Sequence, residues 1–217
     1  MDQPRDDTTS TESRSRFHFV GNVLAIDFVN TEVMSGDERV DLLSSFGDVV
    51  DWFAAAGVVS ESQARELRSR WTAVATDAAM YSVRKFRETL RHALEDIVEG
   101  REINDAVVDA INERLSNPVV RTRISRDGNG RHHVSSLMTF ARPDDLLVPV
   151  AESARDLVCT LDLGLVKKCR NPRCILFFYD ATKNHGRSWC SMSACGNREK
   201  VAAHYRRRRG SKRAGPA

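Results

Sequence analysis

The amino-acid sequence places four of its five cysteines in one short segment, as two pairs with identical spacing. Four residues separate Cys169 from Cys174 and Cys190 from Cys195, and fifteen residues lie between the pairs. Zinc takes four soft ligands in a tetrahedron, and two local pairs joined by a loop can supply that geometry. Because four thiolates leave no open position for water or substrate, we expect one structural Zn²⁺ rather than a catalytic one.

Other chemistry of these cysteines fits the spacing less well. A redox dithiol favours the C-x-x-C spacing, which is absent from the sequence. Disulfides are disfavoured because we expect a cytoplasmic protein, and the cytoplasm keeps thiols reduced. His185 is an alternative ligand, but it falls at the tip of an expected hairpin and four cysteines already suffice. His204 lies more than two helical turns beyond the last cysteine.

Residues 175–192 are expected to form a hairpin between the two cysteine pairs. The segment "ILFFYD" has the composition of a strand, "ATKNHG" that of a turn and "RSWCSM" that of a returning strand. Ser193 then caps a helix over residues 194–209, so that Cys195 lies in the first turn, where the helix N-terminus stabilises a thiolate. A knuckle, a hairpin and a helix that carries the last ligand make a treble-clef-like zinc finger.

The end of the chain is strongly basic. Residues 167–217 hold 14 Lys and Arg against 2 Asp and Glu, whereas the rest of the chain holds 19 against 28. This asymmetry predicts a polyanionic partner, and a solubilising tail is the alternative. The candidate nucleic-acid-binding residues all follow the last cysteine: Asn197, Arg198, Lys200, Arg206, Arg207, Arg208 and Arg209.

Helix geometry divides these candidates into two roles. The four consecutive arginines point in different directions around a helix axis, because successive residues turn by about 100°, and this suits contact with phosphates. Arg198 and Arg209 share a face and are candidates for reading guanine, with Asn197 placed for adenine. The competing interpretation is that Asn197 and Arg198 bond to cysteine sulfurs or to backbone carbonyls beside the zinc. Four further cations are candidates for offsetting the charge of a zinc tetrathiolate: Lys167, Lys168, Arg170 and Arg173.

The whole chain is expected to be α+β and mainly α-helical, with a small β-hairpin in its N-terminal domain. We expect a disordered tail over residues 1–16 and a mainly helical domain over residues 17–164. The zinc finger is expected over residues 165–209, followed by a basic disordered tail over residues 210–217.

Periodicity and stop signals locate the helices of the N-terminal domain. Ser60 is expected to begin a helix, because Gln63 completes a capping box, and Gly57 and Gly100 are expected to end two others. The sequence "DGNG" predicts the turn of the hairpin, and Cys159 is expected to be a core thiol. A short buried helix or strand is expected over residues 23–29, and longer helices over residues 41–59, 61–80, 79–99, 103–117 and 144–164.

Asn30, Arg84 and Arg87 form a candidate site for a small anionic ligand. Asn30 is a polar residue inside an apolar segment, so it either finds a buried partner or lines a pocket. Arg84, Arg87 and Arg91 recur at the spacing of one helix face, which would bring a cation to that pocket. The alternative is a solvated face on which these arginines pair with glutamates four residues on.

Several protein classes are disfavoured by what the sequence lacks. It has no apolar run of the roughly 20 residues that cross a bilayer and no secretory leader, so we expect a cytoplasmic protein with no membrane partner. It has no phosphate-binding glycine loop, no G-x-S-x-G and no H-E-x-x-H, so we expect that the protein is not an enzyme.

The chemistry-bearing segments resemble one known family of bacterial proteins. "CGNREKVAAHYRRRR", with "WCSM" and "CRNPRC" before it, is similar to the CGNR zinc finger, and "GNVLAIDFVNT" and "RKFRETLRHAL" resemble parts of the ABATE domain to which that finger is joined. The resemblance runs from about residue 17 to residue 209. It implies that Cys169, Cys174, Cys190 and Cys195 are the zinc ligands. It also implies a stress-linked transcription regulator that senses a ligand through its N-terminal domain.

These observations predict a zinc-dependent, DNA-binding transcription regulator, with a structural finger and a basic helix that contacts duplex DNA. The alternative is an RNA-binding or protein-interaction module in which the finger is a rigid scaffold. Both nucleic acids present phosphates to the same arginines, so the sequence leaves DNA and RNA open, together with the target sequence and the oligomeric state.

Overall fold

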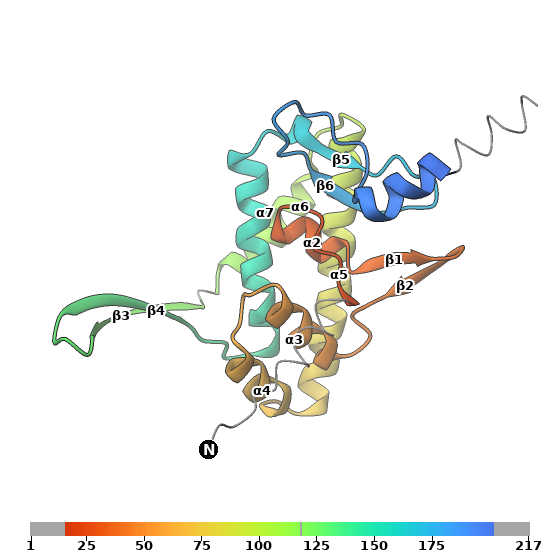
Figure 1. The fold of residues 1–217 in the computed structure, drawn as a ribbon. Coiled ribbons are helices and arrows are strands. Elements are labelled where there is room, and N and C mark those ends of the chain that lie inside the picture. Colours follow the sequence, from red (N-terminus) through yellow and green to blue (C-terminus); the bar gives the residue numbers. More distant parts are fainter. Residues whose placement is uncertain (1–15, 118, 202–217) are drawn as a thin grey trace, which may run out of the picture.

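A computed structural model describes residues 16–117 and 119–201 of the chain (Figure 1). Its α-helices are α2 (Leu24–Val29), α3 (Phe46–Ala55), α4 (Glu61–Ser69), α5 (Ala73–Val98), α6 (Asp105–Leu115) and α7 (Val148–Thr160). Short helical turns are η1 (Pro143–Leu147), η2 (Leu163–Leu165) and η3 (Met192–Gly196). The strands are β1 (Glu32–Ser35), β2 (Glu38–Asp41), β3 (Val120–Arg126), β4 (His132–Met138), β5 (Val166–Lys168) and β6 (Phe177–Tyr179). The prediction of a mainly α-helical α+β fold is confirmed.

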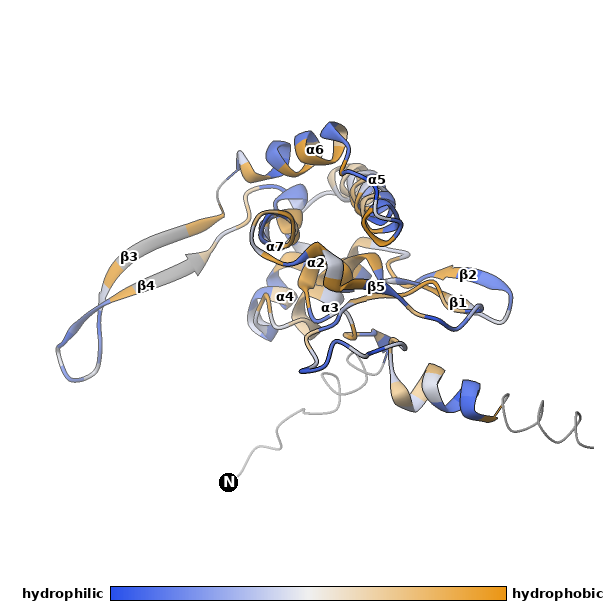
Figure 2. Ribbon diagram, turned by 90° about the horizontal axis from the view of Figure 1, so that it is seen from above, coloured by the Kyte–Doolittle hydropathy of each residue, from blue (hydrophilic) through white to orange (hydrophobic). Residues whose placement is uncertain are grey.

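The short helix α2 lies between α5 and α7, and α6 packs against these same two helices (Figures 1 and 2). Ile26, Phe28 and Val29 of α2 are completely buried, because the whole helix is enclosed by its neighbours. Trp52 of α3 packs against Phe28 with ring centroids 5.6 Å apart, which joins α3 to the same core. No helix in the described ranges is both long and apolar enough to cross a membrane.

Local capping signals set several helix boundaries, as predicted. The Ser60 side chain accepts a hydrogen bond from the Gln63 backbone N–H, and the Gln63 side-chain oxygen accepts one from the Ser60 backbone N–H, which confirms the capping box before α4. Ser45 and Asp48 form a second capping box before α3. Gly57 and Gly100 follow α3 and α5 with φ of +74° and +71°, a conformation that suits glycine at a helix end.

The prediction of two helices meeting near residue 80 is wrong. Helix α4 ends at Ser69, and the Thr72 side chain accepts a hydrogen bond from the Ala75 backbone N–H, so it caps a new helix. The resulting α5 then runs unbroken for 26 residues. Trp71, between the two helices, packs edge-on against Phe46 and donates a hydrogen bond to the Ala141 carbonyl. This tertiary anchor fixes the break where hydrophobic periodicity alone would continue the helix.

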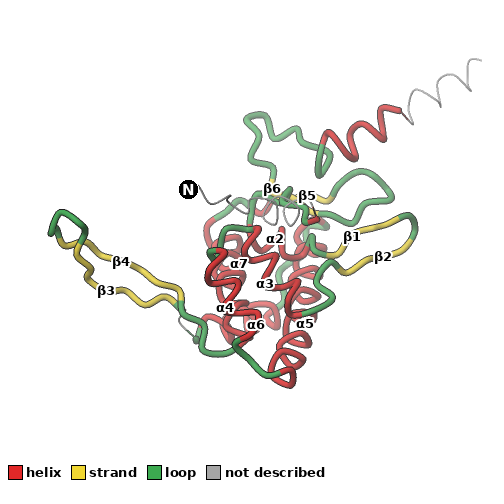
Figure 3. The backbone as a smooth tube through the Cα atoms, turned by 60° about the horizontal axis from the view of Figure 1, so that its bottom comes forward, coloured by secondary structure: helices red, strands yellow, loops and turns green. Residues whose placement is uncertain are grey.

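Two hairpins extend from the helical body (Figures 1 and 3). The antiparallel pair β3–β4 confirms the hairpin predicted around "DGNG", and its register pairs Ile124 with Val134. The other pair, β1–β2, was not predicted, although Gly36, with φ of +64°, lies at its turn.

The prediction that Cys159 lies in the core is wrong, because its side chain is exposed near the end of α7. The buried positions of α7 include Val150, Ala154 and Leu157, and Cys159 falls outside that stripe.

Strand β6 joins the hydrophobic core of the C-terminal module to that of the helical body. Strand β6 pairs with β5 in antiparallel register, with Phe177 opposite Lys168. Successive side chains of a strand face opposite ways, and here Phe177 joins the main helical core while Phe178 packs with Cys169, Cys190 and their neighbours. The one strand therefore connects the two cores.

Candidate metal centre and the surfaces around it

The first cysteine pair lies on a tight turn that is held by hydrogen bonds within the sequence "CRNPRC". The Asn171 side chain accepts a hydrogen bond from the Arg173 backbone N–H at 3.0 Å. The backbone carbonyl of Asn171 accepts a second one from the Cys174 backbone N–H at 2.9 Å. The Cys169 backbone N–H donates to the carbonyl of Leu176 at 2.9 Å. The turn thus brings Cys174 back beside Cys169, as a zinc knuckle requires.

The second pair is brought in by a helical turn, but not through the predicted hairpin. Residues 187–191 form no strand, and β6 pairs with β5 instead. Ser191, rather than Ser193, caps the turn by accepting a hydrogen bond from the Ala194 backbone N–H. Cys195 lies in this first turn, as expected. The helix continues to Val201, where the described residues end.

Arg187 replaces the missing strand pairing with side-chain bonds. Its guanidinium donates to the carbonyls of Trp189, Cys190 and Val20, and it lies 4.1 Å from the centre of the Phe178 ring. One side chain therefore fixes the segment that carries Cys190 and attaches it to the beginning of the N-terminal domain.

The four predicted ligands come together with the geometry of a zinc site. Their Sγ atoms all lie within 4.8 Å of one another. A Zn–S bond of about 2.3 Å places the sulfurs of a tetrahedral site about 3.8 Å apart. The sulfurs of Cys174 and Cys190 are 3.8 Å apart and those of Cys190 and Cys195 are 3.6 Å apart. The residues therefore fit one structural zinc ion, as predicted, and the side chain of His185 bonds instead to the Asp180 carbonyl.

The clustered thiols shift one another's pKa values. Hydrogen bonds from Cys174 and Cys190 lower the pKa of Cys169 to about 2. The same bonding raises the pKa of Cys174 to about 12 and also raises the pKa of Cys190. Because zinc binds thiolates, metal binding at this cluster displaces protons from the thiols whose pKa values are raised.

The N-terminal segment "GNVLAIDFVNT" holds the outer edge of β6. The Asn30 side chain both donates to the Phe177 carbonyl and accepts from the Phe177 N–H, each at 2.9 Å. The Gly21 carbonyl accepts from the Tyr179 N–H at 2.8 Å, and the Asn22 side chain donates to the Tyr179 carbonyl at 3.0 Å. These bonds supply what a neighbouring strand would supply, so the edge of β6 does not need one.

Gly21 also meets Asp27, whose carboxylate accepts a hydrogen bond from the Gly21 N–H at 2.7 Å. A Cβ atom at Gly21 would lie 2.8 Å from that carboxylate and 2.8 Å from the Ile26 side chain, so only glycine fits. Burial raises the pKa of Asp27 to about 6, although hydrogen bonds from Gly21 and Val20 and the nearby charge of Arg187 oppose the rise.

Replacing Asp27 with asparagine should make stability less dependent on pH. A carboxyl whose folded pKa is raised favours folding below its unfolded value, near 3.8, and this contribution disappears as the pH rises through about 6. Between pH 5 and pH 8 the wild type should therefore lose roughly 1–1.5 kcal/mol relative to the Asp27→Asn variant. Denaturant unfolding of both proteins across this range would check it, and parallel stability curves would contradict it.

The predicted anion-site residues have partners within the chain. Arg87 is 2% exposed; it makes two hydrogen bonds to the carboxylate of Asp41, at 2.7 and 2.6 Å, and a third to the Thr31 hydroxyl. Arg84 lies 3.9 Å from the same carboxylate, and Asn30 is occupied by β6. The anion site stays a prediction, and a ligand there would have to displace these partners.

Arg91, which shares the helix face of Arg87, joins the helical body to the zinc knuckle. Its guanidinium donates to Glu32 at 3.0 Å, to the Val29 carbonyl at 2.8 Å and to the Ile175 carbonyl at 3.3 Å. Ile175 directly follows the zinc ligand Cys174. The sequence left two interpretations of Arg91 open, a cationic stripe beside a pocket and a solvated helix face. A buried role could have been suspected from its position one turn after Arg87 and one residue after the core residue Leu90.

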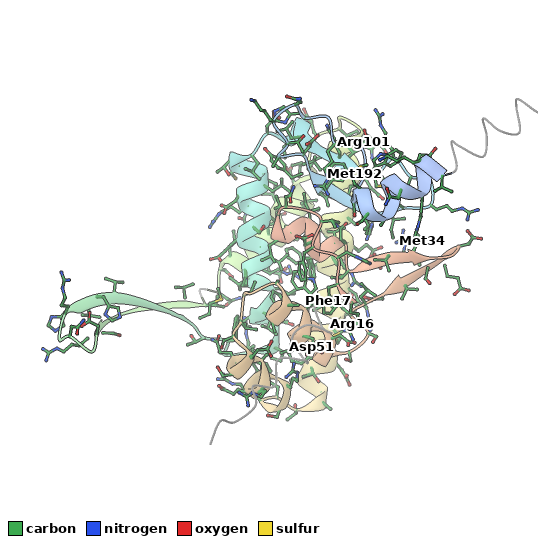
Figure 4. All side chains as sticks on the ribbon, viewed as in Figure 1. Arg16, Phe17, Met34, Asp51, Arg101 and Met192 are labelled. Carbon is green, nitrogen blue, oxygen red and sulfur yellow. The ribbon has the colours of Figure 1, made fainter. Side chains whose placement is uncertain are left out.

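An open cleft of about 640 Å³ lies between the finger and the β1–β2 hairpin. Met34 of this hairpin, which Figure 4 labels, lies on one side of the cleft. The cleft is lined by Met34, Gly36, Asn171, Pro172, Arg173, Arg198 and Glu199. Two cations from different parts of the finger, Arg173 and Arg198, thus reach one cleft.

The other predicted nucleic-acid contacts fall into two groups. The Asn197 side chain donates to the Ser193 carbonyl at 3.3 Å, which matches the structural alternative for this residue, and Lys200 is exposed. Arg206, Arg207, Arg208 and Arg209 lie outside the described residues. Of the cations considered as counter-charges to the zinc, Lys167 instead pairs with buried Asp180 and Lys168 with Glu95.

Comparison with known families agrees with this geometry. Residues 22–161 match the ABATE family, described as a "putative stress-induced transcription regulator", and residues 166–208 match the CGNR zinc finger. No curated protein matches the chain. The first match spans most of the chain, and the second contains the four clustered cysteines. The chain therefore belongs to the ABATE family and carries a CGNR zinc finger after its ABATE domain.

Proposed function

We propose that the protein is a zinc-dependent, DNA-binding transcription regulator of the bacterial cytoplasm, without catalytic activity of its own. The observation that carries the proposal is the placement of Arg173 and Arg198. Arg173 directly precedes the ligand Cys174, Arg198 follows the ligand Cys195 by three positions, and both line one open cleft. Arginines that line an open cleft can bind the phosphates of a nucleic acid. An α-helix beside them fits the major groove of duplex DNA and can reach the edges of the bases.

The ABATE domain, in this proposal, acts through the finger that it holds. Asn30 and Arg91 bond to backbone carbonyls of the finger on either side of Leu176, so a change in the helical domain would reach the zinc knuckle directly. A small ligand that binds this domain would therefore alter the orientation of the finger. The free cysteines of the cluster fit a reducing cytoplasm.

Binding of matched duplex DNA and structured RNA by the full-length, zinc-loaded protein at several salt concentrations tests the proposal. Each neutralised phosphate contributes about −0.9 to the slope of log K against log salt on duplex DNA. Replacing both Arg173 and Arg198 with glutamine should therefore reduce that slope by roughly 1 to 2 and weaken binding to all sequences.

The matched control is Arg155→Gln, which removes an exposed arginine from α7. It should leave affinity and slope unchanged. Absent or salt-insensitive duplex binding by the zinc-loaded protein would contradict the proposal. A preference for RNA would favour the alternative, an RNA-binding module with a structural finger.

A further inference from the structure

The β3–β4 hairpin is an arm that leaves the helical body (Figures 1 and 3). It presents apolar side chains to solvent. Ile124 and Val134 pair directly across its strands, and they are 75% and 69% exposed. A two-stranded hairpin by itself is at best marginally stable in water, and it gains stability when one face packs against another surface. An exposed β-branched pair in the middle of the arm indicates such a surface.

The arm is basic, whereas the domain from which it extends is acidic. Residues 119–139 hold four arginines and one aspartate. That aspartate, Asp127, is used within the turn, where it accepts hydrogen bonds from the backbone N–H groups of Asn129 and Arg131, each at 2.9 Å. The rest of residues 1–166 holds 27 acidic and 15 basic residues. The surface that fits the arm is therefore acidic with an apolar portion.

Helix α6 of this same chain presents a surface of that kind. Asp105, Asp109 and Glu113 are exposed at intervals of four residues, which places them along one face of the helix. Val108, beside Asp109, is 39% exposed. The adjacent Arg114 pairs with Glu113 at 3.3 Å, and its guanidinium lies 4.0 Å from the centre of the Phe86 ring. The exposed carboxylates that this stripe offers to a partner are therefore those of Asp105 and Asp109.

We propose that the arm is a dimerisation element that packs against α6 of a second copy of the chain. In a two-fold arrangement each copy contributes one arm and one acidic helix, so the same contact forms twice. Ile124 and Val134 then lie against Val108, and Arg126 lies beside Asp109. The arm extends from the side of the body away from the finger helix (Figure 1), so each copy keeps its basic helix free. This inference does not depend on the proposed function of the finger.

A polyanion is the other partner that a basic arm would attract. The exposed apolar pair favours a protein surface, because phosphates offer nothing to Ile124 and Val134. The two partners predict different results in solution, since only self-association depends on protein concentration without added nucleic acid.

Sedimentation of the full-length, zinc-loaded protein over a range of concentrations tests the inference. The wild type should dimerise, and the double variant Ile124→Thr/Val134→Thr should raise the dimer dissociation constant at least tenfold. Threonine keeps the β-branched shape, so the arm should still form, as circular dichroism would verify. The matched control Val74→Thr changes an 80% exposed valine on α5 and should leave the constant unchanged.

A charge exchange identifies the docking surface. Arg126→Glu and Asp109→Arg should each weaken the dimer by more than threefold, and the two changes together should restore it, because the pair is re-formed with reversed signs. A wild type that stays monomeric at high concentration would overturn the inference. So would a dimer that neither the arm variant nor the charge variants weaken, or an arm whose replacement reduces only nucleic-acid binding.

Discussion

Serine in place of Cys195 should abolish stoichiometric zinc binding and unfold the C-terminal module. The Cys195 sulfur is 3.6 Å from that of Cys190 and is buried with the other ligands. A structural zinc contributes on the order of 10 kcal/mol to folding, and three ligands do not hold it in the same way. Because Phe178 and Leu176 pack directly on the cysteines, their core should be lost with the metal. Zinc content per chain and thermal unfolding would measure both effects.

The matched control is Cys159→Ser, which makes the same substitution at an exposed cysteine outside the cluster. It should change neither the zinc content nor the melting temperature. A Cys195→Ser protein that retains one zinc per chain and melts with the wild type would show that another group completes the site.

Methionine in place of Arg91 should destabilise the whole protein by about 3–5 kcal/mol, the usual cost of removing one partner from a buried ion pair. Arg91 is 4% exposed, and its removal leaves Glu32 and the carbonyls of Val29 and Ile175 without their donor. Zinc should also be released faster, since the Ile175 carbonyl adjoins the ligand Cys174. Urea unfolding and transfer of zinc to a coloured chelator would measure the two effects.

Arg84→Met provides the comparison, because it makes the same change on the same helix at a side chain that is 55% exposed and 3.9 Å from its partner Asp41. Exposed ion pairs of this kind contribute at most about 1 kcal/mol. Equal losses of stability in the two variants, or unchanged zinc release in Arg91→Met, would refute the linking role of Arg91.

Features that depend on neighbouring residues could be predicted from the sequence. The zinc ligands follow from two local cysteine spacings, and the structure brings their sulfurs together. The beginning of α4 follows from Ser60 and Gln63, which bond to each other three residues apart. The hydrogen bonds that hold the tight turn of the first cysteine pair likewise lie within six consecutive residues.

Features that depend on distant partners could not be predicted. The apolar run 175–179 indicated a strand, but nothing local distinguishes β5 from residues 187–192 as its partner. Asn30 and Arg91 read equally well as pocket or surface residues, because their partners lie 147 and 84 positions away in the finger. The division at residue 164 stays a prediction, and the shared packing of Phe177 shows how much contact crosses it.

Strand β6 is bonded on one edge by β5 and on the other by the N-terminal segment. This arrangement limits how the finger can be inherited or transplanted. A graft of residues 165–201 onto an unrelated protein would leave the backbone edge that Gly21, Asn22 and Asn30 satisfy open to water or to aggregation. It would also expose the apolar ring of Phe177. Recombination between relatives should therefore preserve the N-terminal motif and the finger as one unit, even though they lie at opposite ends of the sequence.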